Sequence, residues 1–381
     1  LVNINLMKVI LFFTYGISLN DWKESGLLNR EIQLYKQLHE KYNVEFAFLT
    51  YGDSQDLGTI NLPFIKIFPV YKYLKKSKND YINLLKSITI PFKISKELKE
   101  FDIFKTNQLL GSWVAIISKI KFKKPLLIRT GYDLITFSKK DNKSKLKQYL
   151  YYLLTKYALK YSDLYLVSSK VDKSYLSKIF FKYQNKIKLR PNWINISSTK
   201  NFNERYDNKL ISVGRLENQK NFNELIKIFS NTDFEIEIYG SGTKKSELIN
   251  NAKKYNTNLK IFEPVTNEIL VKNLSDYKLY ISSSNYEGNP KSVLEAMSAG
   301  CVVIAKNNKN LEEIIQNSKN GFLYESYDQL IDYVELIIND EKLWKEISRS
   351  ATNSVVENNS LSKLLDVEYE DYKNLKFSNK P

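Results

Sequence analysis

The chain contains one cysteine and one histidine among its 381 residues. A single cysteine, Cys301, excludes an internal disulfide, and a single histidine excludes the Cys/His clusters that hold zinc. We therefore expect Cys301 to pack as a small apolar side chain at the start of a strand. His39 ends a helical pattern, and we expect it to be a partly exposed helix-end residue without a catalytic role.

Two kinds of segment are also missing from the sequence. No uninterrupted run of 18 apolar residues occurs, which argues against a membrane-spanning helix. The apolar run that begins at Met7 lacks the small-residue cleavage site of a secretory signal, so we expect a cytoplasmic protein whose first strand lies there. No Asp-x-Asp pair occurs either, so clustered carboxylates for a divalent ion are absent from the sequence, and we expect neither a metal nor a bound cofactor.

Positive charge is concentrated in one half of the chain, although the net charge is +16 overall. Residues 1–200 carry 35 Lys plus Arg against 15 Asp plus Glu, a balance of +20, whereas residues 201–381 carry 23 against 27, a balance of −4. A genome rich in lysine codons would raise the positive charge of both halves alike. The asymmetry therefore indicates that the first half faces something anionic, such as a membrane surface, a lipid phosphate, a charged glycan or nucleic acid.

Strand-like and helix-like segments alternate along both halves, which predicts parallel sheets covered by helices. In the first half we expect strands at 8–14, 44–50, 126–129 and 164–168 and a helix at 28–40. Polar residues 195–209 interrupt the pattern and are interpreted as a linker. A second series follows, with strands at 209–214, 234–240 and 259–262 and helices at 222–229, 244–256 and 266–275.

One passage of the second half carries most of the functional information. Residues 279–283 predict a buried strand, residues 286–289 a turn, and Pro290 has the fixed φ favoured at the first position of a helix. The opening of a helix offers unpaired N–H groups and partial positive charge, so residues 288–293 suit phosphate binding. Glu287 precedes this expected phosphate-binding segment, and Glu295 follows it. A ligand with sugar hydroxyls on both sides of a diphosphate, a nucleotide sugar, fits this arrangement.

The stretch EGNPKSVLEAMSAGCVVIA at 287–305, followed by NGFL at 320–323, resembles the signature of retaining glycosyltransferases with the GT-B fold, family four of the sugar transferases. The resemblance is strong over 210–324 and architectural over the N-terminal half. It implies an α/β fold of two Rossmann-like, doubly wound parallel-sheet domains that face a central cleft. We expect an acceptor-side domain at 1–194, a nucleotide-sugar-binding domain at 195–360, and a C-terminal helix at 361–381 that crosses back to the first domain.

The resemblance also implies roles for the residues of this passage. Glu295 would accept hydrogen bonds from both ribose hydroxyls, and Glu287 would orient the transferred sugar. Backbone amides of the loop would hold the sugar and the phosphates, namely those of Gly288, Asn289, Lys291 and Ser292. Neither acid would be a nucleophile, because in this family the departing phosphate is thought to take the proton of the acceptor while both groups stay on one face of the sugar.

Other candidates follow the predicted strands of the second half. Arg215 lies at the end of the first of these strands and Lys220 at the entrance of the next helix, so both cations are expected to point into the crevice. They resemble the phosphate clamp of the family and would stabilise the charge that develops on the leaving diphosphate. The resemblance further suggests that Gly240 and Gly242 let the backbone approach the nucleotide and that Pro264 lies at the base.

The candidates of the first half are fewer. Gly26 precedes the first predicted helix, where the family usually places a small-residue loop near the diphosphate and the acceptor. Arg129 ends a predicted strand and is expected to face the cleft with Tyr132 and Asp133. Many family members have a histidine here that touches the donor sugar. This chain has none, so Tyr132 or Asp133 is the expected substitute.

Residues 72–99 and 139–160 interleave lysines with tyrosine, leucine, isoleucine and phenylalanine. Helices of this composition can lie on an anionic bilayer, and they can also be core-facing helices with solvated lysines. The +20 balance of the first half favours the bilayer, so we expect peripheral attachment to the inner face of the cell membrane.

These observations together predict a metal-independent, retaining glycosyltransferase. It would transfer a sugar from a UDP- or GDP-sugar to a glycan or lipid-linked glycan in surface polysaccharide synthesis. One alternative is a sugar-nucleotide epimerase with the same fold, which the shortage of histidines and of extra cleft carboxylates disfavours. Another is a basic nucleic-acid-binding protein, which would need a binding module that the sequence does not show. We therefore expect no nucleic-acid partner.

Overall fold

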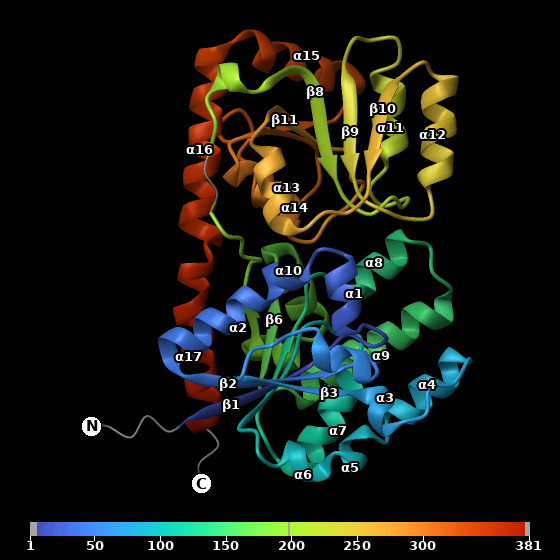
Figure 1. The fold of residues 1–381 in the computed structure, drawn as a ribbon, viewed down its shortest axis with the longest axis vertical. Helices are drawn as coiled ribbons and strands as arrows, with labels where there is room; N and C mark the ends of the chain where they lie inside the picture. The colour runs from blue at the N-terminus through green and yellow to red at the C-terminus, as the bar shows by residue number, and fades with distance from the viewer. Residues whose placement is uncertain (1–5, 197–198, 378–381) are drawn as a thin grey trace. The chain divides into compact units, whose positions relative to one another are not determined.

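The computed structural model describes residues 6–196 and 199–377. The chain divides into two compact units (Figure 1). Unit 1 comprises Leu1–Arg190 and Leu364–Pro381, and unit 2 comprises Pro191–Lys363. The chain thus crosses between the units after Arg190 and again after Lys363, whereas the sequence predicts boundaries after residues 194 and 360.

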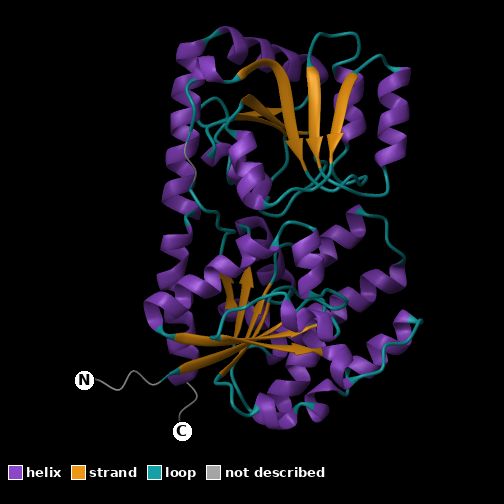
Figure 2. Cartoon of the chain, in the orientation of Figure 1, coloured by secondary structure: helices purple, strands orange, loops and turns teal. Residues whose placement is uncertain are grey.

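Unit 1 contains a seven-stranded sheet in the order β3-β2-β1-β4-β5-β6-β7, and every paired neighbour is parallel. Its strands are β1 Met7–Phe12, β2 Val44–Thr50, β3 Ile65–Pro69, β4 Ile103–Thr106, β5 Leu126–Arg129, β6 Leu164–Val167 and β7 Ile187–Leu189. The central strands are buried along almost their whole length, because helices cover both faces of a parallel sheet (Figure 2). The strand order reverses between β1 and β4, which is where ligands bind in sheets of this type.

Helices connect these strands. They are α1 Leu19–Glu24, α2 Leu28–Tyr42, α3 Val70–Tyr73, α4 Asp80–Ser87, α5 Ile90–Lys93, α6 Ser95–Leu98, α7 Ser112–Phe122, α8 Leu134–Lys140, α9 Lys145–Tyr161 and α10 Lys170–Ile179, with 3₁₀ turns η1 Ser54–Gly58 and η2 Phe181–Lys186. In the last turn of α2, the ring of His39 stacks on Phe64 with centroids 4.0 Å apart, and its Nδ1 lies 3.1 Å from the Val44 carbonyl oxygen. His39 is partly buried there, and these contacts give it a packing role.

The C-terminal helix α17, Leu361–Phe377, belongs to unit 1 from Leu364 onward. A buried ion pair anchors it to the sheet, because Lys105 in the middle of β4 contacts Glu368 of α17, and both side chains are almost inaccessible to solvent. Arg190 adds a second pair, with Nη2 2.6 Å from a carboxylate oxygen of Asp371. The helix is thus fixed through ion pairs to a buried lysine of β4 and to an arginine that directly follows β7.

Unit 2 contains a six-stranded parallel sheet in the order β10-β9-β8-β11-β12-β13. Its strands are β8 Tyr206–Val213, β9 Glu235–Tyr239, β10 Asn258–Phe262, β11 Tyr277–Ser282, β12 Val302–Lys306 and β13 Phe322–Tyr324. Its helices are α11 Phe222–Ile228, α12 Lys245–Lys254, α13 Asn267–Leu274, α14 Lys291–Ser298, α15 Tyr327–Asn339 and α16 Glu341–Asn359, with a 3₁₀ turn η3 Phe202–Glu204.

Neighbouring residues of the central strands supply both faces of this sheet. Leu210 packs in one core with α11, α12 and α15, whereas Ile211 packs in another with α13 and α14. Successive side chains of a strand point to opposite faces, so a strand covered on both sides needs a continuous apolar run. With two parallel sheets covered by helices, the predicted class of two doubly wound α/β domains is confirmed.

The predicted linker at 195–209 is wrong at its C-terminal end, and residues 197–198 of it lie outside the described residues. Phe202 is buried, and β8 already begins at Tyr206. Polar residues at the start of β8 concealed the strand, because they are paired across the sheet. Lys209 Nζ lies 3.0 Å from Glu235 and 2.8 Å from Glu237 of β9.

Cys301 directly precedes β12 and is buried, as predicted. Its Sγ donates a hydrogen bond to the Leu274 carbonyl oxygen at 3.1 Å. Burial raises the pKa of the Cys301 thiol to about 12, although the nearby Arg205 guanidinium favours the thiolate. Within the described ranges, no helix is both long enough and apolar enough to cross a membrane.

Candidate functional site

The carboxyl ends of four neighbouring strands of unit 2 bring most of the predicted residues to one edge of the sheet. Gly214 and Arg215 follow β8, Gly240 follows β9, and Pro264 lies in the loop after β10. The loop after β11 contains Glu287 and leads into α14. Ligands of doubly wound sheets bind at this edge, so it is the candidate site of unit 2.

The loop from β11 to α14 has the predicted strand, turn and helix, with one difference. Pro290 is the N-cap residue, with φ −72° and ψ 115°, and α14 begins at Lys291. The fixed φ of proline suits both positions, but the extended ψ puts Pro290 outside the helix. The N–H groups of the first turn therefore begin at Lys291 and Ser292, two of the predicted amides.

Two predicted residues from different loops form an ion pair in this site. Lys220 Nζ lies 2.6 Å from Glu287 Oε1, and their side chains are 13 % and 7 % exposed. Lys220 lies just before α11, where its carbonyl oxygen accepts a hydrogen bond from Ser283 Oγ at 2.8 Å. The predicted clamp cation and the predicted sugar-orienting acid are thus in direct contact.

Arg215 is exposed beside this pair, and a glutamine that the sequence analysis did not identify connects them. Arg215 Nη2 donates to Gln219 Oε1 at 3.2 Å, and Gln219 Nε2 donates to the Tyr286 carbonyl oxygen at 3.0 Å. The Gln219 carbonyl oxygen in turn accepts from the Asn285 amide at 3.0 Å. Gln219 therefore joins the loop that carries the cations to the loop that carries Glu287.

The second predicted acid, Glu295, is buried in α14 with 2 % of its surface exposed. Its Oε1 accepts a hydrogen bond from Asn267 Nδ2 at 2.8 Å, and Asn267 is the first residue of α13. Sequence reasoning missed Asn267, because no motif marks an amide that acts through another side chain. Pro264 lies three residues earlier in the same connection, and the neighbouring Glu263 forms an ion pair with Lys245.

Gly240 and Gly242 have a packing reason to be glycine. A Cβ atom added at Gly240 would lie 1.9 Å from the Gly214 carbonyl oxygen, and one added at Gly242 would lie 2.6 Å from the Leu216 carbonyl oxygen. Both separations are far below van der Waals contact. These glycines therefore let the loop after β9 lie directly against the segment that carries Arg215.

Asn289 and Lys291, whose backbone amides were predicted to bind the donor, contact the first residues of unit 2 through their side chains. Asn289 is hydrogen-bonded to Asn192, and Lys291 Nζ lies over the ring of Trp193. Asn289 is 8 % exposed, so its side chain is held inside unit 2. The sequence analysis did not connect these two segments, which are about a hundred residues apart.

The candidates of unit 1 are more scattered. Gly26 lies between α1 and α2 with φ 70°, a left-handed conformation that favours glycine, so the turn alone accounts for it. Asp133 caps α8, accepting hydrogen bonds from Ile135 N at 3.2 Å and Thr136 N at 2.7 Å. Burial raises the pKa of the Asp133 carboxyl. Its role as a helix cap was not predicted.

Arg129 and Tyr132 lie at the carboxyl end of β5. Arg129 is close enough to the Lys105–Glu368 pair for its charge to favour the ionised form of Glu368. The ring of Tyr132 packs against Phe137 at a centroid distance of 4.5 Å. The structure therefore places Arg129 beside the ion pair that anchors α17, and Tyr132 at the start of α8.

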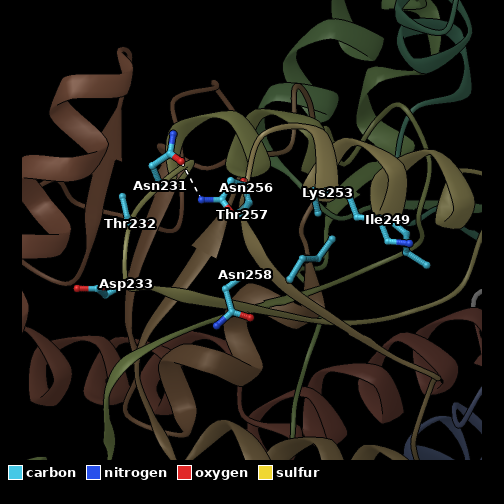
Figure 3. Close-up of a pocket in the computed structure, with 10 residues that line it drawn as sticks. Asn231, Thr232, Asp233, Ile249, Lys253, Asn256, Thr257 and Asn258 are labelled. Atoms are coloured by element: carbon cyan, nitrogen blue, oxygen red, sulfur yellow. Dashed lines mark hydrogen bonds between the residues drawn. The ribbon is translucent and has the colours of Figure 1, made fainter.

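A pocket of about 480 Å³ lies elsewhere in unit 2 (Figure 3). It is lined by residues that precede or begin β9 and β10, at the amino ends of these strands. Asn256 Nδ2 donates to Asn231 Oδ1 at 2.9 Å in its wall, and both asparagines are left-handed turn residues. None of the predicted residues lines this pocket, so it is separate from the candidate site.

Comparison with known families and proteins points to one class of enzyme. Residues 195–354 match the family described as glycosyl transferases group 1. An uncharacterized glycosyltransferase of Haemophilus influenzae is 25 % identical over 354 residues, which cover 90 % of this chain and 94 % of that protein. The similarity to glycosyltransferases therefore extends through both units.

A second relative has a more specific name. It is the N-acetylgalactosamine-N,N'-diacetylbacillosaminyl-diphospho-undecaprenol 4-alpha-N-acetylgalactosaminyltransferase of Campylobacter jejuni. It is 25 % identical over 150 residues, which cover 38 % of this chain and 41 % of that protein.

Among solved structures, Anabaena HepE in complex with UDP superposes with a TM-score of 0.72 at 14 % identity. The match covers 97 % of this chain and 100 % of that chain. At this level of identity the likeness shows the fold, and it confirms the predicted GT-B class.

Proposed function

We propose that the protein is a retaining glycosyltransferase that uses a nucleotide-sugar donor, a UDP- or GDP-sugar. The observation that carries this proposal is the contact between Lys220 and Glu287, with Arg215 beside it, at the carboxyl edge of the sheet. A pair of cations suits a diphosphate, and an adjacent carboxylate suits sugar hydroxyls. The match of residues 195–354 to glycosyl transferases group 1 supports the same reaction.

The chemistry follows from where charge moves. As the bond between the sugar's anomeric carbon and the diphosphate oxygen breaks, negative charge grows on the leaving diphosphate, and Arg215, Lys220 and the α14 amides stabilise it. The acceptor hydroxyl forms the new bond on the same face of the sugar and passes its proton to the departing phosphate. Glu287 orients the sugar, and Glu295, held by Asn267, accepts from the ribose hydroxyls.

The ion pair keeps both groups ready for the donor. In the free protein Lys220 neutralises Glu287, which is 7 % exposed and would otherwise be an unpaired buried carboxylate. When the donor binds, Lys220 can turn to the diphosphate and Glu287 to a sugar hydroxyl, so neither charge loses its partner. The cations also supply the charge that a divalent ion provides in other transferases, and we propose that transfer is independent of metal.

A panel of nucleotide sugars tests the proposal. We expect one UDP- or GDP-sugar to raise the melting temperature, because a ligand that binds only the folded state stabilises it. We also expect slow hydrolysis of that donor with its anomeric configuration retained in the released sugar, and no change in rate with EDTA. If no donor raises the melting temperature or is hydrolysed, the proposal is wrong. If EDTA abolishes turnover and magnesium restores it, only metal independence is wrong.

We further propose that the acceptor is a glycan or a lipid-linked glycan at the inner face of the cell membrane, in the synthesis of a surface polysaccharide. The name of the Campylobacter relative describes a diphospho-undecaprenol-linked acceptor. The features of this chain that support a membrane location are two helices of unit 1.

Helix α4 has its polar and apolar faces reversed relative to an ordinary surface helix. Its buried residues are Asn83 and Ser87, and Ser87 Oγ accepts a hydrogen bond from Trp113 Nε1 at 2.8 Å. Its outward residues are apolar, with Tyr81 82 % exposed and Leu85 63 % exposed. A water-facing helix normally shows the opposite pattern.

Helix α9 has a similar exposed apolar stripe. Leu146, Tyr149 and Leu150 are more than half exposed, and their spacing of three and four residues places them on one face. Exposed lysines precede α4, at Lys75, Lys76 and Lys78, and others lie within α9, at Lys145, Lys147 and Lys156. Exposed apolar side chains between lysines suit an anionic bilayer, into which the former insert while the latter contact lipid phosphates.

A charge placed in the reversed helix should weaken membrane binding. We expect Leu85→Glu to lower partitioning onto phosphatidylcholine–phosphatidylglycerol vesicles by roughly 10-fold or more, because it removes about 1.5–3 kcal/mol of apolar burial and adds repulsion. Vesicle sedimentation measures the effect. The matched control is Leu336→Glu, at an exposed leucine of α15 in unit 2. Equal partitioning of wild type and Leu85→Glu would contradict the assignment of α4.

A further inference from the structure

The segment at which unit 2 begins is tied to the loop that precedes α14. The Asn192 amide donates to Asn289 Oδ1 at 2.8 Å, and Asn192 Nδ2 donates to the Asn289 carbonyl oxygen at 2.5 Å. One asparagine therefore holds both the side chain and the backbone of another. Asn289 follows Gly288 and precedes Pro290, so its peptide orientation determines where the amides of this loop point.

The neighbouring residue holds the other side of Pro290. Lys291 Nζ lies 4.7 Å from the ring centroid of Trp193, and Trp193 is 3 % exposed. Pro290 has no N–H and cannot fix the loop by a hydrogen bond of its own. The loop is thus held at Asn289 and at Lys291 by two consecutive residues of one segment.

The same segment is joined to the end of α16, where the chain is about to leave unit 2. The Asn192 carbonyl oxygen accepts from Asn359 Nδ2 at 2.7 Å, and Ile194 N donates to the Asn359 carbonyl oxygen at 2.9 Å. Leu361 N then donates to the Ile194 carbonyl oxygen at 3.2 Å. The first and second crossings of the chain therefore share one hydrogen-bonded seam, and Asn192 connects that seam to the loop.

We infer that Asn192 is a positioning residue for the donor site. Through Asn289 it sets the orientation of the loop amides. It also couples nucleotide binding at these amides to the hydrogen-bonded seam that the two crossings of the chain share. This inference rests on the proposed function. If the seam affects donor affinity, donor binding must affect the seam by the same free energy. Asn192 itself touches neither phosphate nor sugar in this role.

The sharpest variant is Asn192→Asp, which keeps the size and the backbone N–H but places an oxygen where Nδ2 faces the Asn289 carbonyl oxygen. We expect the Kd for UDP or GDP, titrated separately by calorimetry, to rise about tenfold, because a partly buried hydrogen bond becomes a repulsive contact. We expect KM for the donor to rise in parallel and kcat at saturating donor to fall as well, because the same amides stabilise the charge that develops on the leaving diphosphate. Asn192→Ala removes the hydrogen-bond donor Nδ2 without introducing repulsion, and it should show a smaller effect in the same direction.

The control is Asn358→Asp, which makes the same chemical change at an exposed residue whose Nδ2 donates within α16, to the Ser354 carbonyl oxygen at 2.8 Å. It should bind nucleotide as the wild type does. Hydrogen exchange adds a readout that simple loss of stability does not move. Saturating nucleotide should protect the amides of residues 192–194 and 359–361 in the wild type, and this protection should be lost in Asn192→Asp while residues 210–213 of β8 keep theirs.

Three outcomes decide between the ideas. Weaker nucleotide binding in Asn192→Asp, with the control unchanged and seam protection lost, supports the inference. Wild-type affinity in both Asn192 variants overturns it while leaving the proposed function intact. Failure of the wild type to bind UDP, GDP or any donor of the panel overturns the proposed function and the inference together.

Discussion

Replacing Arg215 with alanine is expected to lower kcat by roughly 10²- to 10³-fold, the range found when one preorganised donor to a developing negative charge is removed. Arg215 is exposed at the end of β8 and its guanidinium is oriented by Gln219, so its loss should not disturb the core. KM for the donor should rise less than kcat falls, because the charge on the diphosphate is larger in the transition state than in the bound donor. Steady-state kinetics with the donor identified by the panel measure both constants.

Two further variants make this result specific. Arg215→Lys keeps the charge but loses the planar fork, so its activity should lie between wild type and Arg215→Ala. Arg349→Ala removes an exposed arginine of α16 in the same unit and should leave kcat unchanged. A value of kcat for Arg215→Ala within about threefold of the wild type would show that the leaving diphosphate does not rely on this side chain.

Replacing Lys105 with methionine is expected to lower the free energy of unfolding of unit 1 by about 3–5 kcal/mol. The side chains of Lys105 and Glu368 are 1 % and 0 % exposed, so the variant leaves a carboxylate buried without its cation. Burial opposes the ionised form of Glu368, but the charges of Lys105 and Arg129 outweigh it and hold its pKa below the usual value. Urea unfolding followed by tyrosine and tryptophan fluorescence measures the loss.

The double variant Lys105→Met with Glu368→Leu should recover most of that stability, because two apolar side chains replace a buried ion pair at little cost. The control uses another ion pair of α17: Lys41 of α2 pairs with Asp366 of α17 on the surface. Lys41→Met should unfold close to wild type, since exposed ion pairs contribute little. Equal stability of Lys105→Met and wild type would mean that α17 is held by its apolar contacts alone.

The sequence predicted the first and last residues of some strands correctly and missed other strands, because these contain charged residues. Strands β2 and β5 have the predicted bounds, 44–50 and 126–129, because a largely apolar segment marks each one. Strand β4 reads IFKT, and its lysine hides it, since the partner that allows Lys105 to be buried is 263 residues away. The polar start of β8 was taken for a linker for the same reason. Local patterns cannot reveal a charge whose partner lies far along the chain.

The residues of the candidate site also fall into those that a local sequence pattern marks and those that it does not. Motif residues such as Glu287 and Lys220 could be found, because spacing and strand ends mark them. Gln219, Asn267 and Asn192 could not, because each acts through another residue and amide side chains carry no sequence signature. That the glycines after β9 let the backbone approach the nucleotide stays a prediction, and the structure adds that they allow two loops to pack closely.

Burial of Cys301 has a practical consequence for spectroscopy. Its thiol is inaccessible and its pKa is raised to about 12, so it offers almost no thiolate to maleimide reagents near neutral pH. A cysteine engineered at an exposed site of each unit can therefore carry a fluorophore or spin label without first removing the native thiol. Paired reporters of this kind would measure distances between the units in solution, with and without nucleotide, in an otherwise unaltered chain.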